Sequence, residues 1–483
     1  MNTRSSPFPK SIPLAVTTLA VLLAGCVDSG NWKPAPKLAP EALTADRALS
    51  GAPVDPSAWP RDGWWHSYGD PQLDALVAEA LAGSPSLEIA EARLRAAQGQ
   101  VLAAHAARLP AVSADANLTR QRFPEDQLYP PPLGGSYWNQ GQAQLDFSYD
   151  LDFWGHNRAL SEAARSGVEA AQANRAAAQL ALAVAVVEAY IQLDLQYALL
   201  DVANDNLKQQ QTILDLTQQR VGAGLENVAR VKQSEGQLAL IRAGAAYVQG
   251  NVDLARHQLA DLVAAGPDRG LALTRPKLVA PSGVALPAVL PAELLGRRPD
   301  IVAARAQVES AAHGVKAAEA DFYPNVNLTA FAGFQSFGLS TLFDAPDRVF
   351  GGGPAFSLPV FNRDAIKGAL YVQQAQLDQS VGEYNQTLLD AVREVADVVA
   401  NWRALERETI EQQTALDDAQ RSYDLTTDRY RAGLDNYLSV LSSENQVFVA
   451  EGLRAELEAR RLTFSVDLVR ALGGGYPALA PRS

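Results

Sequence analysis

The chain carries one long segment twice, and this internal repeat limits the folds that are open to it. Residues 85–110 begin and end with proline, and the same pattern returns 214 residues later at 299–324. A second pair of similar segments, 220–227 and 429–436, is offset by 209 residues. Solenoid proteins repeat every 20 to 50 residues, so this period is too long for that class. The sequence therefore predicts two similar halves that lie side by side.

The N-terminus has the features of a secretory signal. Arg4 and Lys10 precede an apolar run at 12–24, and small residues lead into Cys26. The run is too short for a membrane-spanning helix. Cys26 is the only cysteine of the sequence, so no disulfide can form within one chain. The alternative is an ordinary signal peptide followed by an incidental cysteine.

The Leu-Ala-Gly-Cys sequence at this point resembles a bacterial lipobox, in which the cysteine becomes the lipidated first residue of the mature protein. Acyl chains contribute about 0.8 kcal/mol per buried CH₂, so several of them would hold the terminus firmly in a membrane leaflet. Val27, rather than an aspartate, follows Cys26 and favours the outer membrane. Asp28, one place further on, leaves retention in the inner membrane open for some bacteria.

Charge and hydropathy narrow the class of protein. The formal net charge is −13 and the signal holds two cations, so the mature chain carries −15. This balance argues against nucleic acid or an anionic membrane face as the main partner. After Ala24 no apolar run approaches 18 residues, so we expect no membrane-spanning helix. The remaining way to cross a bilayer is a closed β-barrel.

Alternating apolar and polar residues predict four strands, two in each half. The pattern is clear at 112–119, 142–151 and 325–330, where a period of two indicates strands with one apolar face. A weaker fourth strand is expected at 350–358, which contains Pro354 and a glycine run that suits flexibility or close backbone packing. The polar segments between the strands of each pair, marked by proline or glycine, are 121–139 and 336–349.

Aromatic residues gather around these strands. The segments 123–154 and 322–361 hold 17 of the 35 Phe, Tyr and Trp residues, as in the aromatic girdles of membrane barrels. A soluble β-sandwich would show the same alternation. Four strands are too few to enclose a pore, and open sheet edges in lipid cost several kcal/mol for each unpaired backbone group. A barrel therefore requires several chains.

Long helices account for most of the remaining sequence. Residues 156–221 contain no proline, and apolar residues recur there every seven positions; 238–262 and 438–469 show a similar spacing of three and four. Such repeats indicate left-handed coiled coils, and a run of about 65 residues reaches roughly 100 Å. A periplasmic coiled coil that acts only as a spacer fits these helices equally well. The order strand, strand, long helix, turn, long helix, found twice, favours a barrel wall.

Each repeated octet falls at the turn between two long helices. Gly224 and Gly433 suit the left-handed position that ends a helix, and Asp435 or Asn436 is placed to cap the next one. A turn needs only this chemistry, so a purely structural role stays open for these residues.

Six short motifs, each weak alone but specific when found in this order, are spread over nearly the whole mature chain. They are the lipobox Cys26, WWHSYGDPQL at 64–73, YDLDFWG at 149–155, RRPDI at 297–301, PVFN at 359–362 and YRAGLDNYL at 430–438. Together they resemble the outer-membrane factors of tripartite pumps, the TolC-like family, and within it the NodT-type efflux lipoproteins.

The resemblance implies a mixed α-helical and β-barrel membrane protein with an internal two-fold repeat. Three chains would contribute four strands each to a 12-stranded outer-membrane barrel, which continues into the periplasm as a barrel of helices. Along the chain, the expected parts are a signal peptide (1–25), a lipid-anchored extension (26–62), an equatorial segment (63–84), the helix of the first repeat (85–111), strands 1 and 2 (112–152), a long helical hairpin (156–264), an equatorial or linker segment (265–298), the helix of the second repeat (299–324), strands 3 and 4 (325–360), a second long hairpin (363–472) and a C-terminal tail (473–483).

The implied function is an exit duct through which small molecules leave the cell. The homotrimer would stand in outer-membrane lipid, a periplasmic adaptor (membrane fusion) protein would grip the helical tips, and an inner-membrane pump of the RND type would deliver the cargo. The expected sites are the lipidated Cys26 and a periplasmic tip for gating and adaptor docking, made of Arg220, Gly224, Leu225, Glu226, Arg429, Tyr430, Arg431, Gly433, Leu434 and Asp435.

Position by position, the tip departs from the family in one respect. Tyr430 and Arg431 match residues that link neighbouring helices, and Asp435 matches the acidic residue of the turn. Ser439 and Ser442 stand where the family often has aspartates, which puts a strong anionic constriction in doubt. Three copies of Glu226 or of Asp435 would form acidic rings instead.

An enzyme is the competing class, and the sequence offers little for it. The five histidines are scattered without the spacing of metal ligands, and no glycine-rich phosphate loop opens a βα unit. We expect no catalysis, no metal, no nucleic acid and no cofactor beyond the covalent lipid on Cys26. A periplasmic scaffolding lipoprotein without channel activity is the main rival, and the sequence does not identify the cargo.

Overall fold

The computed structural model places most of the chain in two compact units. The first, here called the strand unit, contains 97–168, 307–382 and the N-terminal residues up to Pro36, and the second, the helix unit, contains 37–96, 169–306 and 383–483. Cys26, the signal and part of the PVFN motif lie outside the described residues. The described residues are 32–39, 42–50, 53, 55, 58–125, 132–280, 286–287, 290–358 and 361–477.

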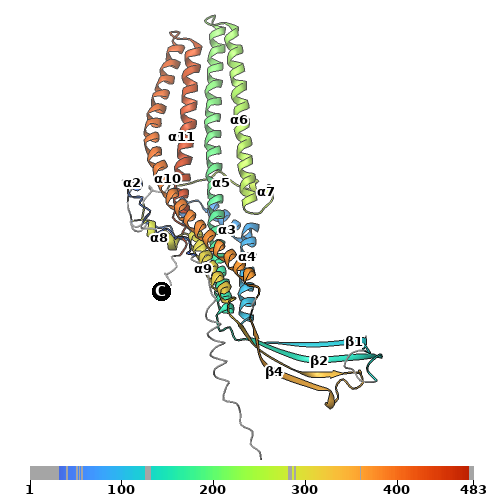
Figure 1. Cartoon of the computed structure of the whole chain (residues 1–483). Helices are drawn as coiled ribbons and strands as arrows, with labels where there is room; N and C mark the ends of the chain where they lie inside the picture. Colours follow the sequence, from blue (N-terminus) through green and yellow to red (C-terminus); the bar gives the residue numbers. More distant parts are fainter. Residues whose placement is uncertain are drawn as a thin grey trace, which may run out of the picture. The chain divides into compact units, whose positions relative to one another are not determined.

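The strand unit contains a four-stranded antiparallel sheet in the order β1-β2-β3-β4 (Figure 1). The strands are β1 (Ala111–Arg122), β2 (Tyr137–Asp150), β3 (Asn325–Ser336) and β4 (Arg348–Ser357). All four predicted strands are confirmed, and the fourth begins two residues earlier than expected. A short 3-10 helix, η3 (Ala345–Asp347), leads into it.

The pairing register gives the sheet one apolar face. Val112 of β1 lies opposite Phe147 of β2, which lies opposite Ala330 of β3. Because side chains alternate across a strand, the polar residues of the same strands point to the other face. The alternation read from the sequence is therefore carried across neighbouring strands.

Glycine in β4 allows the close approach of β3. A Cβ on Gly351 would lie 2.9 Å from the Phe331 ring, and one on Gly352 would lie 3.1 Å from the Ala330 Cβ. Both distances are shorter than an ordinary van der Waals contact, so the weak alternation at this strand reflects close packing.

The sheet does not close on itself. Among the described residues, β1 and β4 each pair with a strand on one side only, and every residue of β1 is exposed. The two edge strands, β1 and β4, therefore each have a row of backbone N–H and C=O groups that need a further partner if the sheet lies in lipid.

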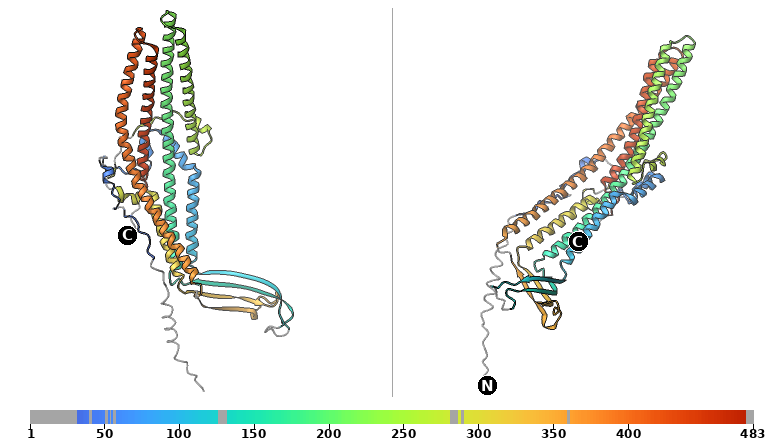
Figure 2. Two further views of the ribbon diagram at one scale, coloured as in Figure 1. Left: turned by 45° about the horizontal axis from the view of Figure 1, so that its top comes forward. Right: turned by 90° about the vertical axis from the view of Figure 1, so that its right-hand side faces the viewer.

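The element order repeats, as the sequence predicts. The first half runs α4 (Pro85–Ala106), β1, β2, α5 (His156–Gly222) and α6 (Val228–Leu262), and the second runs α9 (Pro299–Ala320), β3, β4, α10 (Arg363–Arg431) and α11 (Tyr437–Ala471). The long helices α5 and α10 have 67 and 69 residues, and α6 and α11 have 35 each. Figure 2 shows α5 beside α6 and α10 beside α11. The shorter elements are α2 (Asp46–Leu49), η2 (Trp64–Tyr68), α3 (Pro71–Gly83), α7 (Asp268–Leu271) and α8 (Leu290–Arg297).

The main core of the helix unit lies where α5 packs against α3, α6 and α11. Val186, Tyr190 and Leu193 of α5 are buried in it with Leu76 of α3 and Leu259 of α6. Of the described helices, α5 has a window of mean hydropathy 1.6 that is apolar enough to cross a membrane, and half of this window is buried within the chain. We therefore assign this apolar run to the helix core.

The spacing of three and four at 438–469 predicts one packing stripe on α11, but this stripe is only part of the packing surface of the helix. Leu438 and Asn445 of the predicted stripe are exposed, whereas Tyr437, Val440 and Val447 form a second, buried stripe. Helix α11 contacts α10 through a Thr426–Ser443 hydrogen bond of 2.7 Å and also packs against α5. A helix between two neighbours needs two apolar stripes, which a single heptad does not describe.

The motif at 64–73 forms η2 and the start of α3 and joins them to α5. Asp70 caps α3 by accepting a hydrogen bond from the Gln72 N–H at 2.9 Å, and it also accepts one from the Tyr190 hydroxyl and one from the Lys277 N–H, both at 2.7 Å. Burial raises the pKa of this carboxyl, but the hydrogen bonds outweigh it and hold the pKa below its ordinary value. The Tyr68 hydroxyl shares a hydrogen bond of 2.7 Å with Ser465.

The RRPDI motif has a similar structural role at the start of α9. The Arg298 side chain is buried and donates hydrogen bonds to Asp300 at 2.6 Å, to Glu394 of α10 at 2.7 Å and to the Ala471 carbonyl of α11 at 3.1 Å. One guanidinium thus joins three helices of the helix unit. Several donors in a planar fork make arginine suited to this position.

Candidate functional site at the helical turns

The two turns between the long helices have the same backbone geometry. Gly224 has φ 70° and Gly433 has φ 75°, so both occupy the predicted left-handed position. The Leu225 N–H donates to the Arg220 carbonyl at 2.9 Å, and the Leu434 N–H donates to the Arg429 carbonyl at 2.8 Å. The repeat is therefore preserved at atomic detail, and each long helix ends in a glycine cap.

Asparagine starts the helix that follows each turn. Asn227 accepts a hydrogen bond from the Arg230 N–H at 3.2 Å, and Asn436 accepts from the N–H groups of Leu438 and Ser439 at 2.9 and 3.2 Å. Of the two capping candidates in the second turn, Asn436 thus caps the helix. Capping of this kind contributes about 1 kcal/mol.

Each turn exposes one leucine at the same position. Leu225 is 66% exposed and Leu434 is 69% exposed. Each leucine directly follows the left-handed glycine, so its side chain lies at the point where the chain turns from one long helix into the next. Two apolar groups at equivalent positions offer a contact surface to a partner.

Arg220 and Tyr430 connect the two hairpins close to the turns. The Arg220 Nη1 donates to the Tyr430 carbonyl at 2.8 Å, and its guanidinium carbon lies 4.6 Å from the centre of the Tyr430 ring. Tyr430 is fully buried and belongs to a small cluster with Ile213, Tyr437 and Val440. The structure therefore brings together a predicted residue of α5 and one of α10 through a charge-assisted hydrogen bond and a cation–π contact.

A second polar connection lies one step further from the turns. The buried Gln210 side chain of α5 donates to the Ser234 hydroxyl of α6 at 3.0 Å and to the Tyr437 hydroxyl of α11 at 3.2 Å. It joins three helices, and the sequence did not point to it because Gln210 lies between the apolar heptad positions.

The charged residues of the second turn are paired with each other. Arg429 lies 3.2 Å from Asp435, and Arg431 lies 3.2 Å from Asp428 on its own helix. Hydrogen bonds from the Ser439 side chain and the Asn436 N–H, followed by Arg429, hold the pKa of Asp435 below its ordinary value. The expected link from Arg431 to another helix is not formed within the described part of the chain.

The acidic residue of the first turn is in a different situation. Glu226 accepts a long hydrogen bond of 3.4 Å from the Asn227 N–H and forms no ion pair with any described residue. Ser442 of α11 is exposed, and Ser439 is half-buried. The acidic groups of the two turns are therefore not equivalent, since Asp435 has an arginine partner and Glu226 has none.

Glu444 is a residue of this region that the sequence analysis missed. It is 2% exposed, and neither of its carboxylate oxygens has a hydrogen-bond partner among the described residues. Burial raises its pKa to about 7, and its charge contributes, after burial, to raising the pKa of Tyr423 on α10. The buried stripe of Tyr437, Val440 and Val447 was the signal that would have found it, because Glu444 continues that spacing.

The described residues contain no group of three or more His, Cys, Asp or Glu side chains placed to hold a metal ion. The polar contacts at the turns instead connect helices to one another. Their arrangement suits a site that holds two hairpins together and presents an apolar tip.

Comparison with known proteins gives a consistent result over most of the chain. Residues 76–265 and 290–474 match the sequence model of the family described as "Outer membrane efflux protein". The "Fusaric acid resistance protein FusA" of Burkholderia cepacia is 38% identical over 373 residues, which cover 76% of this chain and 70% of that protein. The "Multidrug resistance outer membrane protein MdtP" of Escherichia coli K12 is 31% identical over 470 residues, which cover 95% of each chain.

The fold is also found among solved structures. The crystal structure of the outer membrane protein VceC from Vibrio cholerae superposes with a TM-score of 0.82 at 36% sequence identity. The matched region covers 87% of this chain and all of that one. Both sheet and hairpins therefore have a counterpart of known structure.

Proposed function

The chain belongs to the outer membrane efflux protein family, and on that basis we propose that three copies of it form the exit duct of a tripartite efflux pump. It is an outer-membrane channel protein of an efflux system, with its helices in the periplasm, as the resemblance of its motifs implies. The channel interpretation replaces the rival one, a scaffolding lipoprotein without channel activity.

The open edges of the sheet are the main observation in support of a trimer. One chain supplies four antiparallel strands, and β1 and β4 each lack a partner strand on one side among the described residues. A sheet with an apolar face is stable in lipid only if its edges are paired. Three chains of four strands make a barrel of about 12, wide enough to enclose water.

The periplasmic end of the duct is the proposed point of assembly with other pump components. We propose that the exposed Leu225 and Leu434 side chains contact a periplasmic adaptor protein, since they are apolar, exposed and repeated in both turns. An inner-membrane transporter of the RND type would load the duct. FusA and MdtP carry names that refer to fusaric acid and to multiple drugs, so we propose small organic molecules as the cargo class.

Lipidation of Cys26 completes the proposal. The Leu-Ala-Gly sequence before Cys26 supports it, and the lipid would anchor the start of the mature chain in the outer membrane. A barrel is already held by its own apolar face, so the lipid would assist insertion rather than provide the only attachment. No catalytic step belongs to this function.

The contact between Arg220 and Tyr430 is the proposed gate latch. It connects the first hairpin to the second beside the turns, with a hydrogen bond of 2.8 Å and a stacked guanidinium. If the second hairpin moves away from the first, both interactions break together. A charge-assisted hydrogen bond contributes about 1.5 to 3 kcal/mol, enough to shift a gating equilibrium by roughly tenfold or more.

Conductance in a planar bilayer tests both the channel and the latch. The wild-type protein is expected to form SDS-resistant trimers and small, infrequent openings. Arg220→Ala removes the guanidinium and is expected to raise the open probability about tenfold, because one side of the latch is lost. Arg230→Ala removes an arginine whose side chain bonds, within the part of the chain that the structure describes, only to Gln233 of its own helix at 2.9 Å, and serves as the control. An equal open probability in the two variants would contradict the proposed latch. An absence of any pores would contradict the proposed channel.

A further inference from the structure

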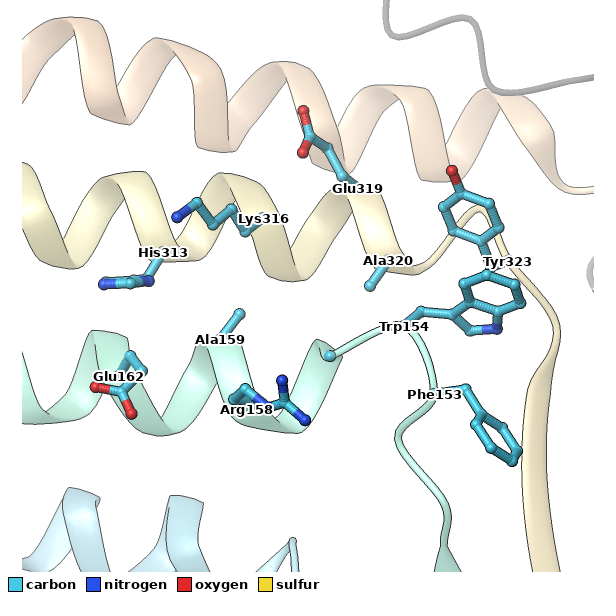
Figure 3. A pocket seen from close by; sticks show the side chains of 11 residues that line it. Phe153, Trp154, Arg158, Ala159, Glu162, His313, Lys316, Glu319, Ala320 and Tyr323 are labelled. Atoms are coloured by element: carbon cyan, nitrogen blue, oxygen red, sulfur yellow. The ribbon is translucent and has the colours of Figure 1, made fainter.

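A cavity of about 650 Å³ lies in the strand unit between the start of α5 and the end of α9. Figure 3 shows the side chains that line it, with Arg158 and Glu162 on one helix and His313, Lys316 and Glu319 on the other. The proposed gate and duct do not use this cavity. Its lining combines aromatic and charged groups.

The aromatic wall of the cavity is fixed in place. The Trp154 and Tyr323 rings stack with their centres 4.4 Å apart and their planes 16° apart. The Trp154 indole N–H also donates to the Pro324 carbonyl at 2.9 Å. Phe153 stands beside them and is 68% exposed. Stacking and a hydrogen bond thus hold a flat surface next to an exposed aromatic ring.

The loop that carries this wall is ordered by Asp152. Its carboxylate accepts hydrogen bonds from the N–H groups of Asn157 and Arg158 at 3.0 and 2.8 Å, and so caps α5. Asp152 has φ 42° and Gly155 has φ 78°, which turns the chain sharply between β2 and α5. The position of Arg158 in the first turn of α5 follows from this cap.

The charges in the cavity are of both signs, and three of them are free. Among the described residues, the side chains of Arg158, Lys316 and Glu319 have no hydrogen-bond or ion-pair partner, and all three line the cavity. The neighbouring carboxylates are already engaged. Glu162 pairs with Arg165 at 3.0 Å, and Asp321 pairs with His156 at 2.9 Å. The cavity therefore offers two free cations and one free carboxylate.

The cavity begins where β2 ends. Ala143, Leu145, Phe147 and Tyr149 alternate with polar residues along β2, and the exposed rings of Phe153 and Trp154 follow in the turn after the strand. In a membrane barrel the apolar face contacts lipid, and aromatic residues mark the level of the headgroups. The end of β2 that leads into α5 is the periplasmic end of the proposed barrel.

We propose that this cavity binds the headgroup of a zwitterionic phospholipid with a primary ammonium, from the periplasmic leaflet of the outer membrane. The phosphate would lie between Arg158 and Lys316, the ammonium would meet Glu319, and the acyl chains would run along Phe153. Two cations suit a phosphate, and a carboxylate accepts hydrogen bonds from an ammonium. The inference rests on the proposed function, because it needs the sheet to stand in the membrane.

Native mass spectrometry of the full-length trimer tests the site directly. The protein is purified in detergent, mixed with phosphatidylethanolamine or phosphatidylglycerol, and the bound lipid per trimer is counted. The wild type is expected to retain up to three phosphatidylethanolamine molecules and to bind phosphatidylglycerol more weakly. The double variant Arg158→Gln with Lys316→Gln is expected to lose phosphatidylethanolamine affinity by about tenfold or more, since both phosphate contacts are removed.

Two further variants make the test specific. Arg230→Gln with Lys232→Gln removes the same charge from a half-buried and an exposed position of α6 and is expected to bind like the wild type. Glu319→Gln removes the ammonium contact and is expected to reverse the preference toward phosphatidylglycerol. Unchanged binding in the Arg158 and Lys316 double variant, or equal loss in the α6 control, would overturn the site.

Failure of the site and failure of the channel give different results. Conductance and SDS-resistant trimers are measured on the same preparations, which also verifies that each variant folds. Pores and trimers without a specific lipid effect would overturn the lipid site alone. An absence of pores and trimers in the wild type would overturn the proposed function, and the lipid site with it.

Discussion

Burial gives Glu444 an unusual protonation equilibrium. Its pKa rises from 4.5 to about 7, so the folded protein holds this proton more tightly than the unfolded chain does. The resulting stability is present below pH 4.5 and is lost as the pH rises to about 7. A shift of this size corresponds to roughly 3 kcal/mol. Near neutral pH the hairpin thus has to bury a charge that has no partner among the described residues.

The variant Glu444→Gln tests this consequence. We expect the melting temperature of the wild-type trimer to fall between pH 5 and 8, while that of the variant stays nearly constant over the same range. The amide has similar size and no charge to desolvate. Glu456→Gln, at an exposed position of the same helix, is expected to keep the wild-type pH dependence. Parallel melting curves of the wild type and Glu444→Gln across this pH range would show that the carboxylate does not control stability.

At the scale of helices and strands, the repeat made most elements predictable. The prolines at the helix starts, the alternating strands and the glycine turns are all local signals, and the structure has an element at each. Two features required contacts that the sequence alone does not reveal. The glycines of β4 weakened the strand pattern because they fit against Phe331 and Ala330.

Long-range packing also explains what was missed on α11. The heptad that was read from the sequence contributes Ala459, Leu462 and Val466 to the main core with α5. Tyr437 and Val440 form a separate cluster with Ile213 of α5 and Tyr430 of α10. Glu444 belongs to the buried stripe of Tyr437, Val440 and Val447, which the heptad does not include. Gln210 escaped notice for the same reason, because polar residues inside a helix bundle give no periodic signal.

The glycine cap of the second turn can be tested as an element. Gly433 has φ 75°, and a Cβ there would meet nothing within 4 Å, so the cost of Gly433→Ala is conformational, about 1 to 2 kcal/mol. Gly236→Ala on α6 also meets nothing within 4 Å but lies in a helix, where it is expected to stabilise by about 1 kcal/mol. Thermal unfolding at constant pH measures both effects. The strain at Gly433 is refuted if both alanines change stability in the same direction.

At the scale of the whole molecule, one chain is an incomplete barrel. The apolar face runs across four strands, yet β1 and β4 keep one free edge each among the described residues. The internal repeat makes both halves contribute similar elements, so three chains approximate a ring of six similar parts. Function in this family of folds thus depends on contacts between chains as much as on those within one.

Disulfide trapping across the proposed interface tests this assembly. Cys26 is the only natural cysteine, so a new disulfide between chains can be assigned to the added cysteines. Asp115→Cys on β1 is combined in turn with Val349→Cys, Gly353→Cys or Ala355→Cys on β4, all on the face opposite to the apolar one. Neighbouring strands lie about 4.8 Å apart, within the reach of a disulfide. We expect at least one pair to give covalent dimers and trimers after oxidation, seen on a denaturing gel of samples boiled without reductant.

The controls separate specific pairing from collision. Each single cysteine variant, boiled in SDS without reductant, is expected to run as a monomer, apart from a weak dimer band. Ser148→Cys with Thr329→Cys joins β2 and β3, which pair within one chain, and is expected to give no ladder. If every β1 and β4 combination remained monomeric while the protein still migrated as a native trimer, the chains would have to meet through another surface. The sheet edges would then need covering by something other than the neighbouring sheet.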